Sequence, residues 1–423
     1  QAINPNRKLN ILLEEYNSVQ VSIRNNMEAL DTFIDNVCEI SDLINSDYWN
    51  GHIRWMNSSE LNNKIIFEVH GRISKEGYDS ASTHMLPTNC VLIGLAGQGK
   101  TRGTAAINKV ELCTNQSIGA ILPSENIDSD YLYLYMDSQY QNLRTISSGD
   151  GGRGGLSKTL LLNFEIVKPN DIGEQKLVAE ALNDVDKLIC ELNTMIEKKR
   201  AIMQGAMQEL LTARRRLPGF DEPWEEMAFK DFGYTYNGLS GKTGLDFGHG
   251  DSKFIMFVNV IYKDTISPNY FEHVNVSKGE KQNKVQKNDL IFNTSSETPD
   301  EVGMCSCVTE EYDDLYLNSF CFGFRFYKPN INPRFLTFLL RSKIGRDLMM
   351  ELAQGSTRYN LPKRKFLSSK IRLPKDIHEQ NEIALVLSDM NDEFEEIEVK
   401  RDKYIAVRQG MMQQLLTGKI RLI

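Results

Sequence analysis

The chain of 423 residues lacks long apolar runs, and no stretch approaches the roughly 20 apolar residues of a membrane span. Its first residues show no signal-peptide pattern, so we expect neither export nor membrane insertion. Seven cysteines without any paired C-x-x-C spacing favour reduced thiols and a cytoplasmic protein. Cys305 and Cys307 form a lone C-x-C, a weak zinc signal because no second pair of ligands accompanies it.

Catalytic motifs are absent as well. The sequence has no Asn-Pro-Pro-aromatic motif of methyl transfer, no glycine-rich S-adenosylmethionine loop and no spaced acidic triad of a nuclease. The six histidines are scattered, and the acidic residues gather on predicted helices, where a solvated face explains them. The sequence therefore indicates binding or assembly rather than catalysis.

The net charge of −8 argues at first against nucleic acid as a partner, but the distribution of charge matters more than the sum. Residues 341–375 contain ten Lys and Arg against two acids, whereas residues 379–398 are dense in carboxylates. We therefore expect a basic surface that can meet phosphate, beside an acidic helix that stays away from it.

The most informative feature that is present is a duplication. Residues 171–217 recur as residues 376–422, at an offset of 205 and with no gap in the alignment. Both copies close with Gln-Gly-x-Met-Gln-x-Leu-Leu-Thr, which begins at Gln204 and at Gln409. A period this long that occurs only twice indicates two similar half-molecules rather than a solenoid.

Each copy is predicted to be one long helix. Apolar residues recur at alternating three- and four-residue steps, as in the seam of a coiled coil. These residues are Val178, Ala181, Val185, Leu188, Leu192, Met195, Ile202, Ala206 and Leu210 in the first copy, and Ile383, Val386, Met390, Phe394, Ile397, Tyr404, Val407, Met411 and Leu415 in the second. About 40 residues at 1.5 Å each give a rod of about 60 Å. Two unrelated helices in one core are the alternative, but such helices rarely share a polar signature.

The rest of the chain is organised around these helices. Apolar residues at helical spacing over residues 8–34 predict an N-terminal helix, and short apolar runs between turn residues predict two mixed α/β domains. The expected boundaries are 1–32 for the N-terminal helix, 33–168 for the first domain, 169–217 for the central helix, 218–373 for the second domain and 374–423 for the C-terminal helix.

The duplication extends into the two domains. The same offset aligns Arg153 with Arg358 and Lys158 with Lys363, and gapped matches continue upstream. The helices have changed little between the halves, whereas the domains have changed a great deal. This contrast favours one shared task for the helices and two different recognition tasks for the domains.

Residues 94–101, Gly-Leu-Ala-Gly-Gln-Gly-Lys-Thr, match the G-x-x-x-x-G-K-[ST] phosphate loop. Such a loop needs a helix that opens at its lysine, and here a β-type run follows instead. An ATP-binding enzyme therefore remains only as the alternative. We favour a glycine-rich basic hairpin that contacts nucleic acid, because Gln and Arg suit base edges and Lys suits phosphate. Its candidate contacts are Gln98, Lys100, Thr101 and Arg102.

Other loops carry further candidate contacts. Arg153 and Arg358 lie in flexible loops, each followed five residues later by a lysine, so Arg153 with Lys158 and Arg358 with Lys363 form candidate pairs for backbone or base contact. Solvated turns are the alternative interpretation.

The second domain has hydroxyl side chains where the first has its basic hairpin. We therefore expect Ser295 and Ser296 to form a recognition surface that differs from the hairpin of the first domain. Arg54 and Lys253 are either phosphate contacts or exposed strand ends.

Two diverged α/β domains alternating with two similar helices, the Gly-Gln-Gly-Lys-Thr-Arg-Gly hairpin and the Leu-Leu-Thr-Gly-Lys-Ile-Arg-Leu ending together resemble the specificity subunit of type I restriction-modification systems. The resemblance covers about residues 33–422. It implies an α+β fold in which two target recognition domains each read one half of a split site on double-stranded DNA. The two long helices would pair as an antiparallel coiled coil and act as a spacer.

The resemblance also implies the partners. The helices would dock two methyltransferase subunits and, through them, restriction subunits. The chain itself would be non-catalytic and hold no cofactor or metal, because S-adenosylmethionine, ATP and Mg would belong to the partner subunits. The N-terminal helix is longer than the family leads us to expect. A coiled-coil scaffold without DNA contact is a third option, which the basic stretch makes less attractive. The docking residues would be Gln204, Met207, Leu211, Gln409, Met412 and Leu416.

Overall fold

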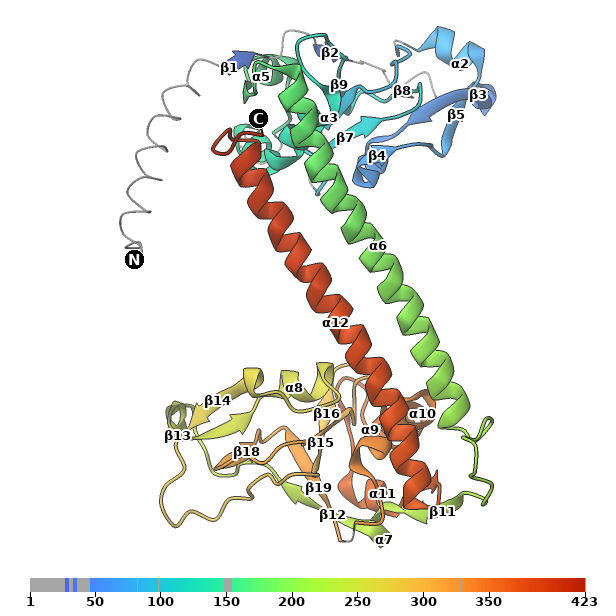
Figure 1. Cartoon of the computed structure of the whole chain (residues 1–423), viewed down its shortest axis with the longest axis vertical. Coiled ribbons are helices and arrows are strands. Elements are labelled where there is room, and N and C mark those ends of the chain that lie inside the picture. Colours follow the sequence, from blue (N-terminus) through green and yellow to red (C-terminus); the bar gives the residue numbers. More distant parts are fainter. Residues whose placement is uncertain are drawn as a thin grey trace, which may run out of the picture. The chain divides into compact units, whose positions relative to one another are not determined.

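The computed structural model describes residues 27–29, 33–35, 46–81, 83–97, 99–147, 154–327 and 329–422. The chain divides into two compact units, one made of residues 1–192 with 400–423 and the other of residues 193–399. The boundary falls within both long helices, α6 (Ile172–Leu210) and α12 (Ile377–Leu415), labelled in Figure 1. Each unit therefore combines one mixed domain with parts of both helices.

The first unit is built on a five-stranded sheet of order β2-β9-β6-β7-β4 and a three-stranded sheet of order β5-β3-β8. The remaining strand pair joins β1 to β10, just before α6 begins. The elements are β1 (Met27–Ala29), β2 (Phe33–Asp35), η2 (Ser46–Tyr48), β3 (Trp49–Met56), η3 (Ser58–Asn63), β4 (Ile65–Ile66), β5 (Gly71–Ile73), α2 (Lys75–Ser80), β6 (Val91–Gly94), β7 (Ala105–Asn108), β8 (Cys113–Thr114), β9 (Ile118–Ile121), α3 (Ser129–Ser138), α4 (Tyr140–Ile146), α5 (Lys158–Leu162) and β10 (Glu165–Val167).

The second unit has a four-stranded sheet of order β12-β19-β15-β17 and a three-stranded sheet of order β14-β13-β18. Two strand pairs, β11 with β21 and β16 with β20, complete it. The elements are β11 (Glu225–Ala228), α7 (Phe229–Phe232), β12 (Gly233–Asn237), η4 (Gly244–Asp246), β13 (Phe247–Ile255), α8 (Phe257–Tyr262), η5 (Pro268–Tyr270), β14 (Phe271–Val274), β15 (Leu290–Asn293), β16 (Ser295–Ser296), β17 (Cys305–Cys307), β18 (Leu315–Leu317), β19 (Cys321–Phe326), α9 (Pro333–Arg341), α10 (Lys343–Leu352), β20 (Tyr359–Asn360), α11 (Lys363–Ser368) and β21 (Lys370–Leu373).

The two units share much of their topology, although the larger sheet has five strands in the first unit and four in the second. In each, the three-stranded sheet has an irregular antiparallel pair (β3 with β5, β13 with β14) and one parallel pair (β3 with β8, β13 with β18). In each, a closing strand before the long helix pairs antiparallel with a strand near the start of the domain. The mixed α+β class and the two similar domains predicted from the duplication are therefore confirmed.

Apolar side chains pack the long helices onto their domains. In the first unit Val178 and Leu182 of α6 share a core with Leu134 of α3, and Leu416 beyond α12 joins the same core. In the second unit the core is richer in phenylalanine, and the Phe366 ring lies 4.4 Å from that of Phe229 between centroids. Burial of each such side chain contributes about 1.5–3 kcal/mol.

A buried glutamine fixes the start of α6 to its domain. The Gln175 Oε1 accepts a hydrogen bond from the Asp128 backbone N–H at 2.8 Å, and its Nε2 donates to the Pro169 carbonyl at 2.7 Å. Both polar ends of a fully buried amide are thereby satisfied, as buried polar groups require.

The start of α12 repeats this arrangement. The Gln380 Oε1 accepts from the Asn332 N–H at 2.9 Å, and its Nε2 donates to the Pro374 carbonyl at 2.9 Å. Gln380 is also fully buried. The two glutamines therefore act as equivalent clamps between a long helix and the loop that precedes α3 or α9.

The glutamate before each glutamine binds an arginine from beyond the end of the other long helix. Arg421 donates to both oxygens of Glu174, and Arg216 donates to both oxygens of Glu379, at 2.6 and 2.8 Å for the second pair. Glu379 is buried and also accepts from the Trp224 Nε1 at 3.3 Å. Each ion pair therefore joins the residues that follow one long helix to the first turn of the other long helix.

The helices lie antiparallel, as predicted. In the first unit Arg408 of α12 binds Asp186 of α6. In the second unit Lys199 of α6 binds Glu393 of α12. As the residue number rises on one helix it falls on the other, which is the antiparallel order.

The predicted seam is only partly correct. Val178, Leu192 and Ile383 are buried as expected, but Met195 and Ile202 are 47% and 57% exposed. Ile196 is buried in their place. A helix with 3.6 residues per turn drifts relative to a regular 3.5-residue pattern, so the buried stripe moves off the predicted positions.

Both helices end earlier than the duplicated segment. Ala213 and Gly418 occupy equivalent positions with φ of +57° and +69°. In both copies the N–H two residues further on bonds back to a carbonyl of the last helical turn, as in a Schellman motif. The residues that follow, up to Leu217 and Leu422, are therefore not helical.

The predicted N-terminal helix is wrong where it can be compared. Within its range β1 pairs with β10, and at its end β2 pairs with β9. Pairing with distant strands has overridden the helical spacing of the apolar residues. Residues 1–26 lie outside the described residues.

Replacing Gln380 with alanine leaves the Asn332 N–H and the Pro374 carbonyl without their partner. We expect the free energy of unfolding of the second unit to fall by about 1–3 kcal/mol for each buried group left unsatisfied. Thermal or urea unfolding of the full-length chain measures the change. Glu382→Ala, two residues further along the same turn and exposed, is the matched control, for which a change within about 0.5 kcal/mol is expected. Equal effects of the two variants would contradict the clamp.

Candidate nucleic-acid interface

The glycine-rich segment of the first domain is a hairpin. Strands β6 and β7 pair antiparallel on either side of residues 95–104, and no helix opens at Lys100 in this described segment. Backbone N–H groups therefore do not converge with a helix dipole as a phosphate loop requires. The hairpin fold is therefore confirmed, its contact with nucleic acid stays a prediction, and the geometry does not support the ATP-binding alternative.

The cations of this hairpin differ in their surroundings. Lys100 is exposed and Thr101 half-buried. The Arg102 Nη1 donates to the Gly154 carbonyl, and its Nε is buried without a hydrogen-bond partner among the described residues. Lys100 is thus available for phosphate, whereas Arg102 also ties the hairpin to the segment before α5.

That segment brings a second candidate close to the hairpin. The Leu156 N–H donates to the Leu95 carbonyl at 2.8 Å, and Lys158 stands exposed in the first turn of α5. The structure therefore gathers Lys100, Arg102 and Lys158 around one end of the larger sheet. Gln98 and Arg153 lie outside the described residues, and their contacts stay predictions.

Arg54 lies in the other sheet, on β3. It is 38% exposed and forms an ion pair of 3.1 Å with Glu68, which Arg72 also contacts at 2.7 Å. Hydrogen bonds, first from Arg54, lower the pKa of Glu68 to about 2. Arg54 is therefore already paired with a carboxylate, and a phosphate would have to compete with Glu68 for it.

In the second domain the hydroxyl-rich stretch is folded inward. Ser295 and Ser296 form strand β16, which pairs with Tyr359 and Asn360 of β20, and both serines are buried. The Ser296 Oγ donates to the Glu301 carboxylate at 2.9 Å. The prediction that Ser295 and Ser296 form a recognition surface is therefore wrong, because the strand pairing turns both hydroxyl groups into the domain.

The β16–β20 pair instead presents Arg358. This arginine is exposed, and its guanidinium lies 5.8 Å from the centroid of the Phe320 ring, which is itself 54% exposed. The Phe320 carbonyl accepts from the Thr294 N–H at 2.8 Å, so the ring belongs to the same loop cluster. No sequence pattern singles out Phe320, because one aromatic residue between two strands looks like a core residue.

Lys363 and Lys253 differ in their exposure and in their contacts. Lys363 donates to the Asn237 side chain and lies over the Phe322 ring, and its burial lowers its pKa. Lys253 is exposed on β13, opposite His273 in the sheet. Both remain candidates for phosphate contact.

The basic stretch of residues 341–375 is less basic at its surface than its composition predicts. Arg341 donates to four backbone carbonyls, among them those of Val260 and Ile261 at the end of α8. Arg346 also donates to carbonyls, and Lys343, Lys370 and Lys375 form ion pairs. Arg341 and Arg346 therefore serve the fold, and the three lysines are already paired with carboxylates at the surface.

A lysine-rich loop that was not predicted from the sequence lies between β14 and β15. Residues 277–288, here called the lysine loop, hold four lysines against one glutamate. Lys278, Lys281 and Lys287 are exposed, whereas Lys284 pairs with Asp314. The regular spacing of about three residues could have signalled a phosphate-binding element.

Polar contacts hold the lysine loop against the domain. Lys242 binds Glu280 at 2.6 Å, and its hydrogen bond is the main cause that lowers the pKa of Glu280 to about 2. Gln282 exchanges hydrogen bonds with the Ser240 backbone in both directions. The single acid of the loop is thus paired with Lys242, which lies outside the loop, and the exposed lysines carry the net charge.

The predicted docking residues separate into two groups. Gln204 and Gln409 are exposed and Met207 and Met412 half-buried, at equivalent positions of the two helices. Leu211 and Leu416 are buried at 1% exposure in the cores of their own units, so their assignment to a docking surface is wrong. They follow the last helical turn and complete the packing against the domains.

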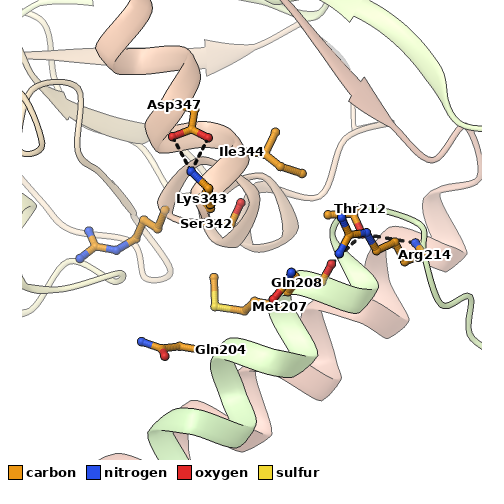
Figure 2. A pocket seen from close by; sticks show the side chains of 10 residues that line it. Gln204, Met207, Gln208, Thr212, Arg214, Ser342, Lys343, Ile344 and Asp347 are labelled. Carbon is orange, nitrogen blue, oxygen red and sulfur yellow. Dashed lines mark hydrogen bonds and ion pairs between the residues drawn. The ribbon is translucent and has the colours of Figure 1, made fainter.

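Gln204 and Met207 line a pocket of about 550 Å³ in the second unit. Figure 2 shows them with Gln208 along α6, across the pocket from Lys343, Ile344 and Asp347 at the start of α10. Lys343 and Asp347 form an ion pair of 2.9 Å. The pocket thus combines amide, thioether and charged groups at the end of the duplicated segment.

The cysteine pair predicted as a weak metal signal is part of the core. Cys305 and Cys307 lie on β17, and burial raises the pKa of each thiol to about 12. Thiols held in this state are poor metal ligands, because metal binding requires the thiolate. Within the described part of the chain, every helix is too short or too polar to cross a bilayer.

Comparison with known proteins places these features in one family. Residues 31–201 and 222–405 both match the family model described as the type I restriction modification DNA specificity domain. The type I restriction enzyme EcoR124I/EcoR124II specificity subunit of Escherichia coli is 29% identical over 146 residues, which cover 34% of this chain and 36% of that protein. The MjaVIII specificity subunit of Methanocaldococcus jannaschii is 22% identical over 341 residues, covering 78% and 79% of the two chains.

A solved structure shows the same fold. The S subunit of a type I restriction-modification system from M. genitalium superposes with a TM-score of 0.58 and 13% identity, over 92% of this chain and 95% of that one. The TM-score supports the fold, whereas identity this low carries no information about the bases read.

Replacing Lys278, Lys281 and Lys287 together with alanine tests the lysine loop. We expect weaker binding of duplex DNA by the full-length chain and a shallower salt slope, log K against log salt, by about 0.9 for each phosphate that is no longer neutralised. The matched control replaces Lys176, Lys187 and Lys198, three exposed lysines of α6, with the same change in net charge. A slope reduced equally by both triple variants would show that only overall charge matters.

Proposed function

The chain belongs to the family of type I restriction-modification DNA specificity domains, and from this we propose that it reads a split DNA sequence and assembles methyltransferase subunits on it. The observation that carries the proposal is a shared arrangement of strands used twice with different loops. Two such domains joined by two long helices suit a site of two specified segments separated by bases that no domain reads.

The loops of the two domains offer different chemistry to DNA. The first domain presents Lys100 and Lys158 around a braced hairpin, and the second presents Arg358 beside Phe320 together with the lysine loop. Cations fix the register on phosphate, whereas Arg and an exposed aromatic ring can contact base edges. Different loops on one framework support two different half-site sequences.

The duplicated helix endings support two identical partners. Gln204 and Gln409 present the same exposed amides, so a protein that fits one ending fits the other. We propose that each ending docks one methyltransferase subunit, and that restriction subunits join through the methyltransferases.

Two glycines in the helix endings add to the proposed docking surface. Gly205 and Gly410 lie inside the helices, and in the described part of the chain a Cβ at either position would meet nothing within 4 Å. Glycine in a helix interior costs about 1 kcal/mol relative to alanine, and nothing among the described residues requires it there. Close approach of a partner backbone would explain its presence at both positions.

The chemistry belongs to the partners in this account. We propose that the chain is non-catalytic and acts in the cytoplasm, with S-adenosylmethionine, ATP and Mg bound by the methyltransferase and restriction subunits. The ATP-binding alternative lacks support, because the hairpin of residues 94–101 leads into an antiparallel strand.

Co-expression of the full-length chain with candidate methyltransferase subunits, followed by mapping of methylated adenines, tests the function. We expect one motif with two specified segments and an unread gap. A single continuous motif, or no chain-dependent methylation with any candidate, would contradict the proposal.

Removing residues 192–198 together with 397–403 deletes seven residues from each helix, about 10 Å at 1.5 Å per residue. We expect the unread gap to change by about three base pairs at 3.4 Å each, while the specified bases stay the same. The same methylation mapping measures both. Altered bases with the original gap would show that the helices do not set the spacing.

The variants Gly205→Ala and Gly410→Ala test the docking surface. Each should raise the stability of the isolated chain by about 0.5–1 kcal/mol, because alanine is the better helix former. We expect each single variant to lose one methyltransferase subunit and the double variant to lose both, as measured by the mass of the assembled complex. Full assembly of the double variant would contradict close approach of a partner backbone at these two glycines.

A further inference from the structure

Each domain carries one loop that joins two neighbouring antiparallel strands of its larger sheet. In the first domain this recognition loop is residues 95–104, between β6 and β7, and in the second it is residues 294–304, between β15 and β17. The first residue of each loop accepts an equivalent backbone bond at 2.8 Å, from Leu156 to Leu95 and from Leu361 to Thr294. The two loops therefore occupy equivalent places although their sequences share little.

An arginine of α4 braces the first recognition loop. The Arg144 Nη1 donates to the Gly99 carbonyl at 2.7 Å and to the Arg102 carbonyl at 3.4 Å. Tyr140 of the same helix donates from its hydroxyl to the Lys100 carbonyl at 3.1 Å, and the Arg144 guanidinium lies 5.6 Å from the Tyr140 ring. The helix thus holds three carbonyls of this loop.

An arginine of α10 braces the second recognition loop in the same way. The Arg346 Nη2 donates to the Val302 carbonyl at 2.6 Å and to the Asp300 carbonyl at 2.9 Å. Its Nε and Nη1 are buried and have no hydrogen-bond partner among the described residues. Burial also lowers the pKa of this guanidinium. A cation buried at such a cost is stabilised by the loop carbonyls.

A glycine marks the place where each loop passes its bracing helix. Gly103 has φ of +82°, and a Cβ there would meet Leu143 and Arg144 at 3.3 Å. Gly303 has φ of +67°, and a Cβ there would meet Met349 and Leu361 at 3.0 Å. Both loops therefore turn in a conformation that favours glycine, against equivalent surfaces of their domains.

The brace acts on backbone carbonyls, which every loop sequence has. One terminal guanidinium nitrogen carries two hydrogens, so Nη1 of Arg144 and Nη2 of Arg346 can each hold two carbonyls whatever the side chains between them. Side chains can then differ from loop to loop while the backbone keeps its place. A loop fixed in advance loses less entropy when it binds DNA and presents its side chains in one register.

We propose that Arg144 and Arg346 are positioning residues for base recognition, each of which fixes one recognition loop and so sets the sequence selectivity of one half-site. This inference rests on the proposed function. It assigns no DNA contact to either arginine, because both act through the loop backbone.

Selection from a randomised duplex library by the full-length chain, assembled with its methyltransferase subunits, tests the proposal. Arg144→Ala should lower base preference about tenfold in one half-site and leave the other unchanged. Arg346→Ala should do the reverse, so each variant controls for the other. Gln141→Ala, an exposed residue of α4, should change neither half-site. The salt slope should stay the same in every variant, because every phosphate contact is kept.

Hydrogen exchange shows whether the domain stays folded. In Arg144→Ala the amides of residues 99–103 should exchange faster, while those of β6 and β9 keep their protection. If the alanine variant fails to fold, Arg144→Lys keeps the charge but ends one bond short of Nη1, so it cannot hold both the Gly99 and the Arg102 carbonyls and should lose selectivity in the same half-site.

Three results would overturn the inference. Unchanged base preference in Arg144→Ala, with its loop exchanging faster, would show that the brace does not set selectivity. An equal loss of affinity for all sequences with a smaller salt slope would make Arg144 a phosphate contact instead. A parent protein that selects no split motif at all would contradict the proposed function itself, which is a distinguishable outcome.

Discussion

The pairing of a buried glutamate with a distant arginine is the constraint on which both units depend. A carboxylate as buried as that of Glu379 is stable only when it is paired and hydrogen-bonded. Its partner, Arg216, comes from beyond the end of the other long helix, and Arg421 serves Glu174 in the same manner. Neither glutamate is therefore neutralised by the mixed domain on which its own helix begins. The neighbouring glutamines then fix each long helix to the loop before α3 or α9, and this contact positions the helix on its domain.

This constraint explains why the helices are alike and the domains are not. The glutamate, the glutamine and the arginine must keep their geometry at the start and after the end of each long helix, so few substitutions are tolerated around them. The recognition loops are held instead through their backbone carbonyls, by Arg144 of α4 and by Arg346 of α10. Their side chains can therefore vary without disturbing the core, which is the property expected of a surface that reads sequence.

The sequence predicted the duplication, the two long helices and the hairpin, because each leaves a periodic or motif-like trace, whereas the antiparallel pairing of the helices was implied by the family resemblance. Predictions from the sequence were wrong where contacts between distant parts of the chain determine the local structure. Strand pairing of β1 overrode a helical pattern, and pairing of β16 with β20 buried Ser295 and Ser296. At least five of the ten cations in the basic stretch bind carbonyls or carboxylates, and composition cannot show which cations are already paired. Phe320 was missed because its significance lies in its exposure, which no single sequence displays. The lysine loop was missed although its regular lysine spacing is visible in the sequence.

The proposed function depends on two domains of one chain contacting two separate segments of the same duplex. Hydroxyl-radical footprinting of the assembled complex on its methylation motif measures this directly. The account predicts two protected segments on one face of the DNA, with accessible backbone between them. One continuous protected segment, or protection that disappears from both segments when either recognition loop alone is altered, would contradict it.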